Sequence, residues 1–126
     1  MHDARVGVDL VDVPAFEARL AGRDDVLAEL FTADELAYCR HQPRPWPHLA
    51  ARFAAKEAVL KALTSGLTGA MSWRDIEIAR DPAGAPRLVI KGASEEALRR
   101  QRLATGAVSL SHTTSHAIAV VLLFPA

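Results

Sequence analysis

Hydrophobic residues in this chain recur with the period of a strand in some segments and with the period of a helix in others. Residues 6–13 are apolar and mostly β-branched except for Asp9 and Asp12, which predicts a largely buried strand. Further strands are predicted at residues 72–80 and 87–91, joined by a turn at 81–86, and at residues 107–112 and 117–124, joined by a polar turn at 113–115. Each pair is expected to form an antiparallel hairpin.

Helical patterns fill most of the remaining chain. Pro14 opens a predicted helix to residue 20, and another covers residues 24–30. Thr32 and Glu35 have the spacing of a capping box, so a helix is expected from Thr32 to about residue 40. A proline-rich connector at 41–48 leads into a long helix predicted at residues 47–65, then a loop containing Gly66 and Gly69; Ser94 is expected to cap a last helix to residue 103.

A strand, several helices and then antiparallel strands interrupted by a helix is the order of an α+β fold. The 126 residues fit one domain, spanning residues 1–126. The final strand is nearly all apolar, which indicates that the sheet packs against something, either the long helix or another subunit.

Composition narrows the possible partners and the compartment. The formal net charge is zero, which favours neither nucleic acid nor an anionic membrane surface as a partner. Cys39 is the only cysteine, so no internal disulfide is possible. No apolar run reaches the ~20 residues needed to cross a bilayer, and the N-terminus lacks a signal-peptide pattern. A cytoplasmic protein is expected.

The long helix carries its charges in unusual places. At 100° per residue, Arg52 and Lys56 project inside its apolar arc, while Glu57 and Lys61 line one edge of that arc. An unpaired charge facing a core is costly, so these cations need anionic partners. Carboxylates of the same chain and phosphates of a ligand both satisfy that need, and the helix alone does not choose between them.

Other polar residues join this pattern. Asp9 lies in an apolar strand, where an ion pair with Arg52 or Lys56 is the simpler interpretation and metal binding the alternative. Taken singly, Glu57 and Lys61 suit a surface pair, and Ser111 and His112 suit an ordinary strand end. Taken together, two carboxylates and several cations suit Mg²⁺, which binds one or two carboxylates plus substrate phosphates.

Four segments resemble the signature blocks of holo-[acyl-carrier-protein] synthases of the 4′-phosphopantetheinyl transferase superfamily. They are Val-Gly-Val-Asp-Leu at 6–10, Phe-Thr-Ala-Asp-Glu-Leu-Ala-Tyr-Cys at 31–39, Arg-Phe-Ala-Ala-Lys-Glu-Ala-Val-Leu-Lys-Ala at 52–62, and Val-Ser-Leu-Ser-His at 108–112. The blocks occur in the family's order, cover nearly the whole chain, and fit the family's short, single-unit class.

The resemblance implies that the 4′-phosphopantetheine arm of coenzyme A is transferred to a serine of an apo acyl carrier protein, releasing adenosine 3′,5′-bisphosphate. It implies a long central helix packed on an antiparallel sheet, with shorter helices, and a homotrimer whose active sites lie between subunits. It implies Asp9 and Glu57 as Mg²⁺ ligands and Lys61 as the residue that meets the pyrophosphate. The remaining coenzyme A contacts that it implies are Arg52, Lys56, Gly66, Pro86, Ser111 and His112.

Phosphoryl transfer needs positioning and charge neutralisation more than covalent chemistry, which this residue set suits. The carrier serine also needs a proton acceptor, and Glu57, directly or through a metal-bound water, is the nearest candidate. That assignment of the base is a hypothesis.

The chain departs from the family pattern at four positions. Ala15 stands where an arginine usually meets the carrier protein, and Thr64 stands where glycine is usual. Ala85 precedes Pro86 in place of a lysine, and Thr113 follows the Ser-His pair in place of an acidic residue. Two other readings stay open: a non-catalytic homologue that binds coenzyme A or a carrier protein, and an internal ion-pair network. The pathway, fatty acid or polyketide biosynthesis, also stays open.

Overall fold

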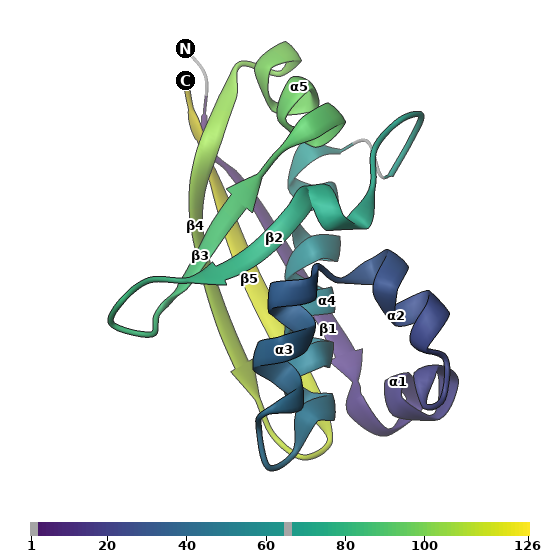
Figure 1. Cartoon of the computed structure of the whole chain (residues 1–126). Coiled ribbons are helices and arrows are strands. Elements are labelled where there is room, and N and C mark those ends of the chain that lie inside the picture. The colour runs from purple at the N-terminus through teal and green to yellow at the C-terminus, as the bar shows by residue number, and fades with distance from the viewer. Residues whose placement is uncertain (1–2, 65–66) are drawn as a thin grey trace.

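The computed structural model describes residues 3–64 and 67–126. Figure 1 shows the course of the chain from β1 to β5. The elements in chain order are β1 (Arg5–Asp12), α1 (Val13–Leu20), α2 (Asp24–Leu30), α3 (Ala33–Arg40), α4 (Pro45–Leu63), the 3₁₀ turn η1 (Trp73–Asp75), β2 (Ile76–Arg80), β3 (Pro86–Ile90), α5 (Gly92–Arg100), β4 (Leu103–His112) and β5 (His116–Pro125).

Two antiparallel sheets flank the long helix α4, which confirms the α+β prediction (Figure 1). One sheet has the strand order β1-β5-β4, and the other is the hairpin β2-β3. Helix α4 contributes to both clusters of buried apolar residues, so it is the centre of the core. Within the described ranges, no helix is long and apolar enough to span a membrane.

Strand β1 crosses α4 at unusually short range because of Gly7. A Cβ at this position would overlap the backbone carbonyl of Ala58 on α4. Residues two apart on a strand share a face, so Asp9 points to the same side of the sheet as Gly7. The glycine therefore brings the Asp9 carboxylate up against α4.

The other face of the large sheet is apolar and open. Its cross-strand pairs are Val6 with Leu122, Val8 with Val120 and Leu10 with Ile118. The exposed fractions are 64% for Val6 and 62% for Leu10. The prediction that residues 6–13 are mostly buried is therefore wrong for this face, because α4 covers the sheet on one side only. The alternating residues of β5 that face α4 (Ala117, Ala119, Val121 and Leu123) are fully buried.

Several elements begin at residues other than the predicted ones. The strand expected at 72–80 begins at Ile76, because Ser72 instead caps the 3₁₀ turn through the backbone N–H of Arg74. Strand β4 begins at Leu103, where a helix end was expected, and β4 carries an irregularity between Ala104 and Ala107. Ser94 does not cap α5: it lies buried inside that helix. The helix begins at Gly92, whose φ of +59° turns the chain beside η1.

Helix α4 begins two residues before the predicted start and ends at Leu63. Its C-cap residue, Thr64, has a left-handed backbone conformation with φ 59° and ψ 20°. That region favours glycine and is strained for a β-branched residue. Strain at this position gives a physical reason for the glycine that the family pattern usually has there.

Candidate functional site

Asp9 and Glu57 face the same surface cavity, of about 480 Å³, between β1, α1 and α4. Asp9 comes from the middle of β1 and Glu57 from α4, five residues after Arg52, and each is only partly exposed. Ala15 and Arg19 of α1 form another wall of the cavity. The structure thus brings together the two carboxylates that the sequence singled out as metal ligands.

Lys61 is the ion-pair partner of Asp9. Its Nζ lies 2.9 Å from Asp9 Oδ1 and also donates to the Val8 carbonyl oxygen at 3.1 Å. The hydrogen bond that Lys61 donates to Asp9 raises the pKa of Lys61, which favours the charged ammonium. The simpler interpretation, an ion pair from Asp9 to Arg52 or Lys56, is wrong because those side chains leave α4 in other directions.

Glu57 lies between two hollows of the surface. It lines the Asp9 cavity and also a neighbouring one of about 420 Å³ that Lys61 and Trp73 share. Burial raises the pKa of Glu57, the negative charge of Asp9 raises it further, and Lys61 partly offsets both. Two carboxylates that repel one another beside a lysine would be relieved by a divalent cation.

This donor set fits magnesium better than zinc. In the part of the chain that the structure describes, no group of three or more His, Cys, Asp or Glu side chains could hold a metal. A structural zinc site needs four such ligands. Two carboxylates, with water and substrate oxygens completing the shell, suit Mg²⁺.

Lys56 lies on another side of α4 and is fully buried. Its Nζ donates to Glu35 Oε1 at 2.9 Å and to the backbone carbonyls of Trp73 and Ile76. Glu35 is also buried, and it accepts from the backbone N–H of Ile78 at 2.9 Å. Because the Lys56 side chain is not exposed, it cannot contact a ligand directly, which argues against its expected contact with coenzyme A. The ion pair and hydrogen bonds of Lys56 connect α4 to α3 and β2.

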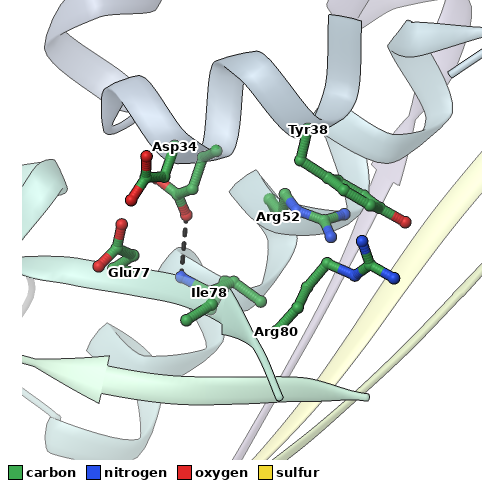
Figure 2. Close-up of a pocket in the computed structure, with 8 residues that line it drawn as sticks. Asp34, Tyr38, Arg52, Glu77, Ile78 and Arg80 are labelled. Atoms are coloured by element: carbon green, nitrogen blue, oxygen red, sulfur yellow. Dashed lines mark hydrogen bonds between the residues drawn. The ribbon is translucent and has the colours of Figure 1, made fainter. Parts of the chain in front are cut away.

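Arg52 lies one helical turn before Lys56 and is also buried, with 5% of its surface exposed. Its guanidinium carbon sits 4.5 Å from the ring centre of Tyr38, and its Nη1 donates to the His48 carbonyl oxygen at 3.3 Å. It lines a cavity of about 300 Å³ between α3 and β2, together with Arg80 (Figure 2).

His112, at the end of β4, lies near the Arg52 cavity through its neighbour His48. Its ring centre lies 4.7 Å from that of His48, and His48 in turn lies edge-on to Tyr38 at 6.1 Å. Burial lowers the pKa of His48, and the charges of His112 and Arg52 lower it further. Ser111 is the exposed neighbour of His112 on β4.

The predicted coenzyme A contacts thus fall into separate places on one chain. Arg52, Ser111 and His112 lie apart from the cavity of Asp9 and Glu57. Pro86 begins β3 and lines a groove that β3 forms with β4. Gly66 lies outside the described residues. Apart from Pro86 and the buried Lys56, the described candidate residues of a single chain therefore form two groups on different sides of α4.

Sequence reasoning singled out none of three residues that contact or line the Arg52 cavity, namely Tyr38, His48 and Arg80. Their places depend on how α3 and β2 pack around α4, and no local pattern reports that packing. Glu35 was found only as a capping-box residue. It fills that role, since its Oε1 accepts from the Thr32 backbone N–H at 2.8 Å, but it also neutralises Lys56.

The sequence and the fold of the chain are similar to those of one protein family. The model of the 4′-phosphopantetheinyl transferase superfamily matches residues 5–121. The chain is 43% identical over 116 residues to a holo-[acyl-carrier-protein] synthase of Moorella thermoacetica, covering 92% of this chain and 90% of that protein. A similar protein of a Geobacter species is 41% identical over 118 residues, covering 93% and 94%. Among solved structures, an ACPS–CoA complex from Chronobacterium ammoniagenes superposes with a TM-score of 0.84, at 30% identity and 99% coverage of both chains.

Proposed function

The chain belongs to the 4′-phosphopantetheinyl transferase superfamily, and from that membership we propose that it is a holo-[acyl-carrier-protein] synthase. It transfers the 4′-phosphopantetheine arm of coenzyme A to a serine of an apo acyl carrier protein. The single observation that carries this proposal is the convergence of Asp9 and Glu57 on one cavity beside Lys61, in a chain that resembles synthases over nearly its full length.

The reaction exchanges one phosphorus–oxygen bond for another. The serine Oγ attacks the phosphorus that carries pantetheine, and the bond from that phosphorus to the bridging oxygen of the pyrophosphate breaks. Adenosine 3′,5′-bisphosphate leaves with the electron pair. We assign the serine proton to Glu57, whose raised pKa suits a base better than an ordinary surface carboxylate. Lys61, charged and exposed, is placed to neutralise the departing phosphate.

We further propose that the enzyme depends on Mg²⁺ held by Asp9 and Glu57. When bound there, the ion supplies a Lewis acid that neutralises pyrophosphate charge. The protein's own contribution is to hold the two carboxylates on a strand and a helix that Gly7 brings into close contact. Arg52 and His112 are proposed to bind the nucleotide end of coenzyme A, because both lie in the positively charged region around Tyr38.

A homotrimer is the assembly that we propose for the open face of the large sheet. Val6, Val8 and Leu10 on β1, with their partners on β5, form an apolar surface that a monomer would leave in water. In this proposal neighbouring copies cover that surface and bring the Asp9 cavity of one copy to the Arg52 region of the next. Light scattering should then give about three times 13.6 kDa. A V8D/L10D variant should be monomeric, and a monomeric wild type would rule the trimer out.

The proposed location is the cytoplasm. Cys39 is buried and cannot form a disulfide within the chain, which suits a reducing compartment.

The activity is tested by incubating the protein with coenzyme A, Mg²⁺ and an apo carrier protein, then measuring the mass of the carrier. A gain of one phosphopantetheine group is expected. Coenzyme A binding without any gain, across a panel of carriers from fatty acid and polyketide pathways, would instead support a non-catalytic homologue. The same panel identifies the carrier that the enzyme serves.

A further inference from the structure

Two imidazole rings lie against each other where the first turn of α4 meets the end of β4. The ring centres of His48 and His112 are 4.7 Å apart, at an interplanar angle of 64°. The His48 residue is half-buried, whereas His112 is exposed. In the part of the chain that the structure describes, neither ring belongs to an ion pair, so no carboxylate fixes the charge of either one.

The surroundings of His48 favour its neutral form. Burial lowers the pKa of His48, and the positive charges of His112 and Arg52 lower it further. The ring also belongs to the first turn of α4, where the helix dipole disfavours an additional positive charge. Two cationic rings in contact repel each other, so the second proton enters the pair less readily than the first.

Tyr38 and Arg80 complete the surroundings of His48. Tyr38 of α3 meets the His48 ring edge-on, with 6.1 Å between the ring centres. The guanidinium carbon of Arg80 lies 4.1 Å from the ring centre of Tyr38. Arg52, one turn after His48 on α4, donates from Nη1 to the His48 carbonyl oxygen at 3.3 Å. These groups are neutral or positively charged.

Carboxylates on nearby elements lie in other places. Asp34 and Glu77 are at the end of the Arg52 cavity opposite to Tyr38 (Figure 2). Glu17 of α1 lines a separate hollow together with Trp46. An anion that binds beside the two rings would therefore bring a negative charge that these carboxylates do not supply.

We infer that His48 is a positioning residue for His112 and that it links coenzyme A binding to proton uptake, because a bound anion lets both rings carry a proton at once. An opposite charge close to an imidazole favours its charged form. Each proton gained attracts the anion more strongly, so binding should tighten as the pH falls. This inference rests on the proposed function, in which His112 binds the nucleotide end of coenzyme A, and it adds the residue that makes this binding depend on pH.

The first test needs no ligand. NMR titration of the imidazole ring protons measures the pKa of His48 in the wild type and in H112Q. H112Q removes one of the two positive charges that lower the pKa of His48, so that pKa should rise. An unchanged titration of His48 would overturn the inference, because it would mean that the two rings do not influence each other's charge.

Calorimetry of coenzyme A binding is the second test, with H48F as the variant that keeps an aromatic ring but cannot take up a proton. Titrations in two buffers of different ionisation enthalpy count the protons taken up on binding. Near pH 6.5 the wild type should take up roughly half a proton more than H48F. The two affinities should agree at pH 8, and at pH 5.5 the wild type should bind about fivefold more tightly, the effect of one added charge near the anion. The phosphate of the ligand also titrates at about pH 6, but equally for both proteins.

H41Q is the matched control, because it removes an exposed histidine at the C-cap of α3 and should leave the pH profile unchanged. A pH profile of H48F equal to that of the wild type would overturn the inference while leaving the transferase intact. So would a loss of affinity in H48F that is the same at pH 8 and at pH 5.5, since that is the result of a purely structural role. A wild type that binds coenzyme A but transfers no phosphopantetheine would refute the proposed function instead, and calorimetry would still decide the role of His48.

Discussion

Arg52 and Lys56 are buried cations one turn apart on α4, and the protein treats their charges in opposite ways. Lys56 meets a buried carboxylate and two backbone carbonyls, so its charge is balanced inside the fold. Arg52 stacks on a ring and keeps an unused donor, and none of the ion pairs among the described residues includes it. Two cations that look alike in sequence thus have different uses. Lys56 connects elements of the core, whereas Arg52 is the cation that we propose to bind an anion of the ligand.

The largest effect should come from replacing Lys56 by Met. This change leaves the Glu35 carboxylate buried without its partner, which typically costs about 3–5 kcal/mol. The matched variant R52M leaves no carboxylate unpaired and should change the free energy of unfolding by less than about 1 kcal/mol. Urea denaturation of both proteins measures the difference.

If K56M does not fold, the double variant K56M/E35Q separates the causes, because it removes both charges and should recover part of the lost stability. Equal destabilisation by K56M and R52M would remove the distinction between the two cations.

The next effect concerns binding rather than stability. Because Arg52 lines a cavity and is proposed to bind coenzyme A, R52M should raise the KM for coenzyme A about tenfold, the value of one charge-assisted contact, with a smaller change in kcat. R52K keeps the charge and should recover part of the loss. Steady-state kinetics with a saturating carrier protein makes the measurement, and a normal KM in R52M would show that Arg52 is structural like Lys56.

Substitutions of Thr64 at the end of α4 measure the effect of backbone strain on stability, for comparison with these charge effects. Thr64 holds a left-handed conformation that costs a β-branched residue about 1 kcal/mol or more. T64G should therefore stabilise the protein by about 1 kcal/mol, and T64A should gain less because alanine is also strained there. Thermal unfolding measures both, and a destabilised T64G would show that the threonine side chain outweighs the strain.

The smallest expected effect on stability concerns Glu57. Burial and the charge of Asp9 raise its folded-state pKa, so its contribution to stability is present below the unfolded pKa and is lost as the pH rises through the folded pKa. E57Q should therefore raise the free energy of unfolding at pH 7 by less than about 0.5 kcal/mol, because the site is partly exposed. This gives a slightly higher melting temperature at pH 7 and no rise at pH 4.

The exposed pair variant E95Q is the control for the Glu57 measurement, and it should lack this pH dependence. A rise for E57Q at both pH values would contradict the electrostatic explanation. Because Glu57 is also proposed to hold the metal and take the proton, the same E57Q substitution should abolish turnover.

The sequence predicted the faces of α4 well, because 3.6-residue periodicity is a local property. It placed Arg52 and Lys56 toward the core and Glu57 and Lys61 at the edge, as observed. It also predicted the capping box of α3. The meeting of Asp9 with Glu57 was implied by the family resemblance, and its cause, the contact of Gly7 with Ala58, became visible only in the fold.

Long-range packing explains what the sequence did not predict. The partner of Lys56 lies 21 residues away on α3, and the partner of Asp9 lies 52 residues away on α4. Arg80 reaches Tyr38 because β2 runs beside α3, which no local motif reports. The open face of β1 was misjudged for a related reason: an apolar strand looks the same in sequence whether a helix or another subunit covers it.

The central claim is that the Asp9 cavity and the Arg52 region, separate on one chain, complete one active site across neighbouring copies. Its most direct test coexpresses two inactive or weakened chains, E57Q and R52M, under different tags and measures transfer to an apo carrier by mass after purification through both tags. In trimers that carry both tags, one site in three joins an intact Glu57 to an intact Arg52, so at coenzyme A concentrations well below KM about a third of wild-type turnover is predicted. Turnover no higher than the average of the two variants measured alone would contradict the claim, because it would mean that each site is built from a single chain.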